Sequence, residues 1–180
     1  LIERALAIHT DRLGDKHPIV AADLHNLAVA RLKLGEAAAA RPLLERALAI
    51  EEETLGASNA KVGRTLGVLA RTHVATGDIT RAAELQVRGL ALIEAALGPS
   101  HPDVATALLD LATIRADEGD LRAARAAAER ALAIRTAALG PRHPDVAEAL
   151  DAVALLRWRA GETRKAREQL LGAAALVARG

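Results

Sequence analysis

Residues 127–147 read AAERALAIRTAALGPRHPDVA, which is the end of one helical pattern, a Leu-Gly stop and the start of another helical pattern. Near-copies of its first eight letters begin at positions 1, 43, 85, 127 and 169, each 42 residues after the previous one: LIERALAI, LLERALAI, LQVRGLAL, AAERALAI and QLLGAAAL. The Leu-Gly stop recurs in the same register at 13–14, 55–56, 97–98 and 139–140. A fixed period of about 20–50 residues is the signature of a solenoid or an array. The sequence therefore predicts a repeat protein.

Each period contains two helical patterns, named here helix A and helix B, joined by a short turn. In the unit that begins at Pro18, apolar residues recur at helical spacing as far as Leu32, and Gly35 ends helix A. Helix B opens at Glu36 and stops at Leu55-Gly56, where the glycine is expected to take the left-handed C′ conformation. A link of one glycine and one acid forces the two helices to run antiparallel. The later units predict helices A at about 59–76, 102–118 and 144–160, helices B at about 78–97, 120–139 and 162–178, and a lone helix B at about 1–13.

No strand pattern interrupts this alternation, so the predicted fold is an all-α solenoid, a right-handed superhelix of antiparallel helix pairs. We expect a single array over residues 1–180, made of a truncated helix B at 1–14 and four repeats at 15–56, 57–98, 99–140 and 141–180. The chain starts inside a repeat, and we interpret it as part of a longer protein. Neither end has the polar sequence of a capping repeat, which arrays need for solubility. We therefore expect the apolar ends to be covered by further repeats or to associate end to end.

Composition limits the classes of partner. Hydrophobic residues make up 51% of the chain but aromatic residues only 1%, so the predicted core is built of Ala, Leu, Val and Ile. The net charge of +1 argues against nucleic acid as a partner, because nucleic acid requires a basic face. The chain has no cysteine and no apolar run approaching the roughly 20 residues that span a bilayer. We expect a cytoplasmic protein without a membrane partner, and the abundance of Ala and Arg suggests a bacterial source.

A histidine precedes proline in three of the four linkers, at His17, His101 and His143. Metal binding is one interpretation, but histidines one repeat apart are too far from one another to share a Zn²⁺ with bonds of about 2 Å. The remaining unit has Asn59 at this position, and Asn is a preferred N-cap. We therefore predict that this column caps helix A.

Catalytic patterns are missing from the sequence. There is no cysteine nucleophile, Ser58 and Ser100 lie at equivalent linker positions, and no glycine-rich phosphate loop follows a strand. We predict that the chain is not an enzyme and that it uses no cofactor and no metal.

Three columns of small residues set the expected packing, and they carry a resemblance to a known family. The columns are Ala28, Ala70, Ala112 and Ala154; Ala40, Ala82, Ala124 and Ala166; and Ala47, Gly89, Ala131 and Ala173. Together with the leucine before the first column (Leu27, Leu69 and Leu111) and the helix–turn–helix unit, they resemble the tetratricopeptide repeat. The 42-residue period and the LG-x-x-HPDVA linker are similar to the kinesin light chain subtype and to many bacterial arrays.

The resemblance implies that helices A line a concave face that binds an extended peptide or a partner helix. Carried over by position, the implied binding residues are His25, Asn26, Lys33, Arg64, Arg71, Asp110, Asp117, Asp151 and Trp158. Basic residues lie in the first half and acidic residues in the second, with Arg159 as an exception. Two interpretations stay open: a dipolar groove that orients a ligand with its acidic end toward the N-terminal half, or ordinary solvated charges.

Where the family often has tyrosine, this chain has Arg31, His73, Arg115 and Arg157, whose stems we expect to cover apolar surface while their heads pair with acids on neighbouring helices. The predicted function is a scaffold for a protein or peptide partner. The alternatives are a regulatory or sensor segment of a larger bacterial signalling protein, linked to an NTPase or a protease, and a self-stacking assembly module.

Overall fold

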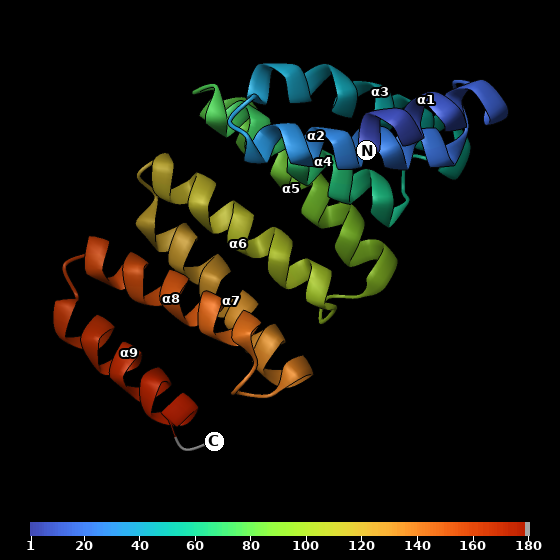
Figure 1. Ribbon diagram of the computed structural model, residues 1–180. Helices are drawn as coiled ribbons and strands as arrows, with labels where there is room; N and C mark the ends of the chain where they lie inside the picture. The colour runs from blue at the N-terminus through green and yellow to red at the C-terminus, as the bar shows by residue number, and fades with distance from the viewer. Residues whose placement is uncertain (179–180) are drawn as a thin grey trace. The chain divides into compact units, whose positions relative to one another are not determined.

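The computed structural model describes the backbone of residues 1–178 and the side chains of residues 1–171, and this part of the chain forms nine α-helices with no strand (Figure 1). The helices alternate between type A (α2, α4, α6 and α8) and type B (α1, α3, α5, α7 and α9). Their bounds are α1 Ile2–Leu13, α2 Pro18–Lys33, α3 Ala37–Leu55, α4 Ala60–Ala75, α5 Ile79–Leu97, α6 Pro102–Asp117, α7 Leu121–Leu139, α8 Pro144–Arg159 and α9 Thr163–Ala178. The helix ends predicted from the sequence agree with these bounds to within two residues.

The chain divides into two compact units, Leu1–Leu97 with helices α1 to α5 and Gly98–Gly180 with helices α6 to α9. In the first unit, α1 packs on α2, α2 on α3, α3 on α4 and α4 on α5. In the second unit, α6 packs on α7, α7 on α8 and α8 on α9. Within each unit, every helix therefore packs against its neighbour in the sequence.

Helices A begin with the predicted cap. The imidazole Nδ1 of His17, His101 and His143 accepts the backbone N–H two residues later, at distances of 3.2, 3.1 and 3.1 Å. Asn59 caps α4 in the same way with its side-chain oxygen, 2.9 Å from the nitrogen of Lys61. Each bond satisfies one of the N–H groups that a helix start leaves without an intrahelical partner. The N-cap prediction is confirmed for all four linkers.

The glycine–acid turns between helices A and B are Schellman motifs. After α2, the N–H of Glu36 donates to the carbonyl of Arg31 and the N–H of Gly35 donates to the carbonyl of Leu32, which is the 6→1 and 5→2 pattern. Gly35 has φ of 80°, a value that only glycine adopts without strain. The same pair of bonds recurs after α4, α6 and α8.

The glycines that end helices B have a different backbone conformation from the predicted one. Gly56 has a positive φ of 85°, but its ψ of 145° is extended, so the expected left-handed helical cap is wrong. The chain leaves α3 in an extended direction, and the N–H of Asn59 returns to the carbonyl of Gly56 at 3.1 Å. This conformation carries the chain to the start of the next helix A.

The three predicted columns of small residues are buried. Ala28, Ala40 and Ala47 have no exposed surface, and their counterparts in the later repeats are also buried. Ala173 lies outside the described side chains. Larger apolar residues fill the rest of each core, among them Leu24, Leu44, Leu66, Val104, Ile114 and Val153.

Candidate partner-binding surface

The implied binding residues of the first unit lie on the exposed faces of α2 and α4. His25 is half-buried, whereas Asn26, Lys33, Arg64 and Arg71 are exposed. The structure brings three of them together, because His25, Asn26 and Arg64 line one hollow. Asn26 also lines a second hollow, which Lys33 borders and which lies between α1 and α2. The five residues are therefore accessible on the first unit, and the prediction that they bind a partner stays a prediction.

The hollow around Arg64 has a volume of about 150 Å³ and is formed by three helices. Pro18, Ala22, His25 and Asn26 come from α2, Glu51 and Leu55 from α3, and Lys61, Arg64 and Thr65 from α4. The Nδ1 atom of His25 lies 3.0 Å from the hydroxyl oxygen of Thr65, which joins α2 to α4. Polar and apolar side chains thus surround a small space with two exposed cations, Lys61 and Arg64, at its edge.

Glu51 is the residue of this hollow that the sequence analysis missed. It is only 5% exposed, and the hydroxyl of Thr65 donates to its carboxylate, whereas its Oε2 is buried with no hydrogen-bond partner. Burial raises the pKa of Glu51, and the hydrogen bond from Thr65 and the charges of Lys61 and Arg64 oppose this rise. A buried carboxylate oxygen without a donor is a destabilising feature.

The hydrogen bonds around Thr65 determine which imidazole nitrogen of His25 carries a proton. A hydroxyl carries a single proton, so when Thr65 donates it to Glu51, His25 must donate from Nδ1. Burial lowers the pKa of His25, and the charge of Arg64 lowers it further. Both effects favour the neutral imidazole, which leaves Nε2 as an acceptor.

A signal for Glu51 was present in the sequence. Glu51 follows Leu44 by seven residues and Ala47 by four, so it lies on the apolar stripe of its helix. The counterparts at the same repeat position are His9, Ile93 and Arg135, which means that one column of helix B mixes charged and apolar residues. A charged residue on a buried stripe indicates a specific partner.

Arg135 is the counterpart of Glu51 in the second unit, and it is likewise charged and buried. Its side chain is 7% exposed and donates from NH1 to the carbonyl of Asp145 at 2.7 Å and to Glu148 at 2.6 Å. NH2 lies 3.4 Å from the hydroxyl of Thr106. The guanidinium therefore joins α7 to α8 and α6.

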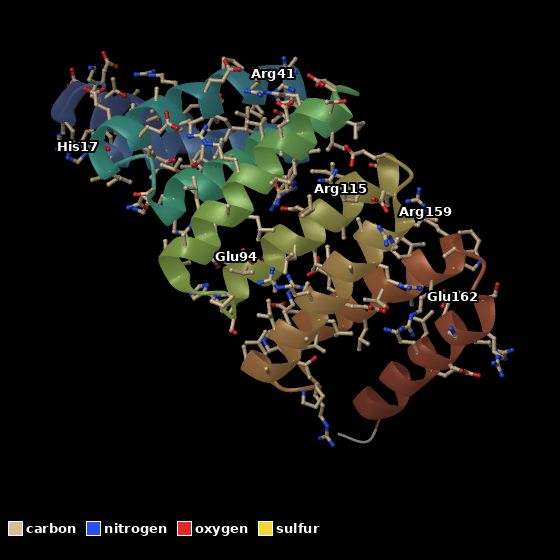
Figure 2. All side chains as sticks on the ribbon, turned by 180° about the vertical axis from the view of Figure 1, so that it is seen from behind. His17, Arg41, Glu94, Arg115, Arg159 and Glu162 are labelled. Atoms are coloured by element: carbon tan, nitrogen blue, oxygen red, sulfur yellow. The ribbon has the colours of Figure 1, made fainter. Side chains whose placement is uncertain are left out.

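The implied binding residues of the second unit are spread along α6 and α8. Asp117 and Asp151 are exposed, and Asp110 is half-buried. Trp158 is 61% exposed and Leu155, on the same face of α8, is 55% exposed. The indole therefore lies on the surface, and its role in partner binding stays a prediction. Arg159, marked in Figure 2, donates to the backbone carbonyl of Ala116 at 3.0 Å.

The arginine column that replaces tyrosine pairs with acids, as expected, although the acids differ. Arg31 of α2 bonds Glu3 of α1 and Glu36 of its own turn, and Arg157 of α8 bonds Glu129 of α7. Arg115, marked in Figure 2, bonds Glu118 at the end of its own helix at 2.7 Å. For Arg115, the prediction of an acidic partner on a neighbouring helix is therefore wrong.

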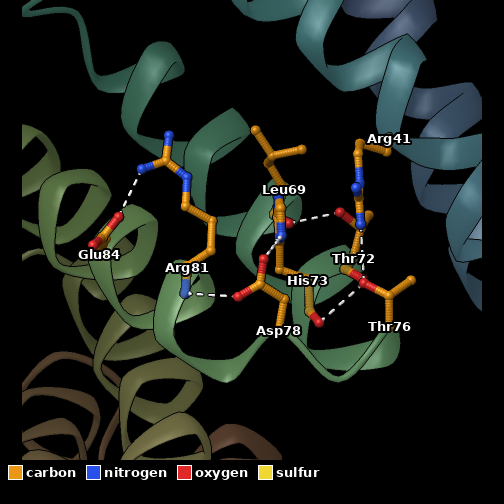
Figure 3. A network of polar contacts seen from close by, with 8 residues as sticks. All are labelled: Arg41, Leu69, Thr72, His73, Thr76, Asp78, Arg81 and Glu84. Atoms are coloured by element: carbon orange, nitrogen blue, oxygen red, sulfur yellow. Dashed lines mark hydrogen bonds and ion pairs between the residues drawn. The ribbon is translucent and has the colours of Figure 1, made fainter.

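His73 takes the place of arginine in the second repeat, and Figure 3 shows the network around it. Its Nδ1 lies 3.2 Å from a carboxylate oxygen of Asp78, and Asp78 also accepts the backbone N–H of Arg81. Beside it, Arg41 of α3 donates to the hydroxyl of Thr76 at the end of α4. These contacts join α3 to the turn between α4 and α5.

The described residues contain neither a metal-binding cluster nor a membrane-spanning helix. No group of three His, Asp or Glu side chains is placed to hold a metal ion. None of the described helices is long and apolar enough to cross a membrane.

Comparison with known proteins identifies the family. The tetratricopeptide repeat family model matches residues 1–53, 24–95, 64–137 and 103–176. A solved structure of a Podosopora anserina protein described as a kinesin light chain with nearly identical TPR-like repeats is similar at 28% identity, over 99% of this chain and 84% of that chain, with a TM-score of 0.77. Among curated proteins, none matches the sequence.

Two more distant structures show the fold alone. BtubC (BKLC) from P. vanneervenii is similar with a TM-score of 0.84 at 22% identity, over 98% of this chain and 70% of that chain. The apo form of RapI has a TM-score of 0.78 at 13% identity, over 94% of this chain and 61% of that chain. The predicted all-α solenoid class and the resemblance to kinesin light chain repeats are confirmed. The chain belongs to the tetratricopeptide repeat family.

Proposed function

We propose that this chain is a non-catalytic scaffold that binds a protein or peptide partner on the exposed faces of its helices A, in the bacterial cytoplasm. The observation that carries the proposal is the hollow among α2, α3 and α4, with Arg64 and Lys61 at its edge. This hollow also contains three of the implied binding residues, His25, Asn26 and Arg64.

The charges around the hollow indicate the partner chemistry. Lys61 and Arg64 lie in the first turns of α4, where the helix dipole adds positive potential. Glu51 offsets one of the two charges, and the lowered pKa of His25 keeps the imidazole neutral. The rim therefore favours an acidic side chain of the partner, with His25 and Asn26 as hydrogen-bonding groups beside it.

The size of the hollow limits how much of the partner enters it. A volume of about 150 Å³ accommodates one side chain of moderate size and excludes a folded segment. We expect the rest of the partner to lie on exposed positions of the same face, such as Arg71 of α4. Binding of this kind is dominated by one or two residues, and the others contribute complementarity.

The test is selection from a random peptide library on the immobilised chain, followed by affinity measurements on the selected peptides. We expect enrichment of Asp or Glu at one position. Replacement of Arg64 by Glu removes a charged hydrogen-bond donor, so Arg64→Glu is expected to weaken binding about tenfold or more. Lys61→Glu is expected to act in the same direction.

The matched control is Arg122→Glu, which makes the same change at an exposed position of α7. Binding to this variant is expected to stay within about twofold of the unmodified chain. Selected peptides without an acidic position, or equal losses for Arg64→Glu and Arg122→Glu, would contradict the proposal. Thermal melting of each variant establishes that the chain stays folded.

A further inference from the structure

Glu51 places a buried acid in the lining of the hollow among α2, α3 and α4, whose rim carries two cations. The residue lines the hollow and is only 5% exposed. The charges of Lys61 and Arg64, on the opposite wall, act on its carboxyl. An acidic side chain that enters from a partner therefore meets two exposed cations and one buried acid.

The internal repeat shows how close such an acid comes to Glu51. Two 42-residue periods later, Arg135 stands at the position of Glu51 and Glu148 at the position of Arg64, so the charges of the pair are exchanged. In that unit NH1 of Arg135 lies 2.6 Å from a carboxylate oxygen of Glu148. Side chains at these two positions therefore reach each other across the junction between a helix B and the next helix A. An acid that bonds Arg64 lies within the same short reach of Glu51.

We propose that Glu51 takes up a proton from the solvent when an acidic side chain of the partner binds in this hollow, so that the site binds a carboxylate and a proton together. The inference rests on the proposed function and states how that site is regulated. Two ionised carboxylates in one small space repel each other, whereas a protonated carboxyl donates a hydrogen bond to a carboxylate. The affinity for an acidic partner therefore rises as the pH falls.

The surroundings of Glu51 make it the group that carries the proton. Thr65 donates to the carboxylate and Oε2 has no hydrogen-bond partner, so Oε1 accepts from Thr65 and protonation of Oε2 breaks no hydrogen bond. Burial raises the pKa of Glu51 in the free chain, against the hydrogen bond from Thr65 and the charges of Lys61 and Arg64. A bound acid raises this pKa further, because a like charge nearby disfavours the ionised form.

His25, Lys61 and Arg64 are the other titratable groups in the described lining of the hollow. Lysine and arginine side chains stay cationic at neutral and mildly acidic pH, so the two residues on α4 take up no proton. Burial lowers the pKa of His25 on α2, and the charge of Arg64 lowers it further. His25 is therefore the one competing proton acceptor among these groups, and the experiment separates it from Glu51.

The experiment measures binding of the selected acidic peptide to the full chain by isothermal titration calorimetry at pH 7.5, 6.5 and 5.5. The acid of the peptide stays ionised over this range, because the pKa of Asp and Glu lies at about 4. We expect the Kd to fall severalfold from pH 7.5 to 5.5, with about tenfold per pH unit as the limit for one proton. Repeating the titration in buffers of different ionisation enthalpy is expected to show uptake of up to about one proton per peptide bound.

Three variants assign the proton to its group. Glu51→Gln removes the charge, so it is expected to bind the peptide severalfold more tightly at pH 7.5, with no proton uptake and no dependence on pH. Glu45→Gln, the same change at an exposed position of α3, is expected to keep the affinity and proton uptake of the unmodified chain. His25→Gln is expected to keep the dependence on pH, whatever its affinity. Thermal melting at each pH establishes folding, and Glu51→Ile replaces Glu51→Gln if that variant is unfolded.

Two results overturn the proposal while leaving the proposed function intact. One is binding that depends on Arg64 but has the same Kd at all three pH values and no proton uptake. The other is a dependence on pH that persists in Glu51→Gln or disappears in His25→Gln. A library that yields no acidic peptide removes the proposed function, and this inference is overturned with it.

Discussion

Gly63 of α4 and Gly89 of α5 face each other so closely that a Cβ atom on either would lie 2.7 Å from the backbone carbonyl oxygen of the other. Real Cβ atoms essentially never come this close to backbone. The counterparts in the first repeat are Ala21 and Ala47, which are both buried. The second repeat thus brings two helix backbones into direct contact.

Replacing Gly89 by alanine is therefore expected to destabilise the protein, although alanine is the better helix former. The intrinsic gain is about 1 kcal/mol, and separating two packed backbones costs about 1–3 kcal/mol. The difference is a net loss of up to about 2 kcal/mol in the free energy of unfolding, measured by urea denaturation. Gly67→Ala is the control: its Cβ would meet only the side-chain oxygen of Gln86, at 3.3 Å, so this variant should be neutral or more stable.

Replacing Glu51 by isoleucine, the residue at the same position of the next repeat, is expected to stabilise the protein at pH 7. The substitution removes a buried carboxylate oxygen that has no partner, a group that costs about 1–3 kcal/mol. We expect a gain of about 1 kcal/mol in the free energy of unfolding. Glu45→Ile, at an exposed position of the same helix, should change it by less than about 0.5 kcal/mol.

The gain from Glu51→Ile should depend on pH in a defined direction. The pKa of Glu51 is raised in the folded state, so the folded protein holds this proton more tightly than the unfolded chain. Stability from this group is fully present below the unfolded value of 4.5 and is lost as the pH rises through the folded pKa. The difference between variant and unmodified protein should therefore be smallest near pH 4 and level off toward neutral pH. A difference that grows on acidification would contradict the assignment.

Replacing His101 by alanine should cost about 1 kcal/mol, because the first turn of α6 loses its side-chain acceptor. His101→Asn should retain the stability of the unmodified protein, since Asn59 makes the equivalent bond at the start of α4. Urea denaturation of the two variants measures the difference. Equal losses for alanine and asparagine would show that the imidazole stabilises the linker by packing.

Removing Glu148 should cost more stability than removing the charge of Arg135, its partner in the ion pair. Glu148→Ala leaves the buried guanidinium without its counter-charge and is expected to cost about 2–3 kcal/mol, whereas Arg135→Met keeps an apolar stem and frees only an exposed carboxylate. Combining the two substitutions should recover part of the loss from Glu148→Ala alone. A double variant as unstable as the sum of the single variants would show that the two side chains act independently.

The fold could be predicted from the sequence because its determinants are local and repeated. The Leu-Gly stops, the glycine–acid turns and the small-residue columns each recur four times at the same 42-residue period, so a chance pattern in one copy is excluded by the others. The conformation of Gly56 could not be predicted in the same way. Several positive-φ conformations suit glycine, and the course of the chain toward Asn59 decides among them.

The candidate site was predicted only in part, because it depends on differences between repeats. His25, Asn26 and Arg64 follow from their places on helix A, and they do line one hollow. Glu51 belongs to helix B, and its charge interrupts an apolar stripe without indicating that Thr65 of another helix is its partner. Pairing between helices comes from the packing, which no single segment specifies.

His9, Glu51 and Arg135 occupy the same repeat position but differ in charge, so the pairing between helices depends on the order of the repeats. His9 bonds Asp23, Glu51 accepts from Thr65, and Arg135 bonds Glu148. Recombination between similar repeats that deleted residues 57–140 would keep the 42-residue phase but bring Glu51, a buried carboxylate, opposite the carboxylate of Glu148. Units that are interchangeable in shape are therefore not interchangeable in charge, and this restricts which duplications and deletions the gene can tolerate.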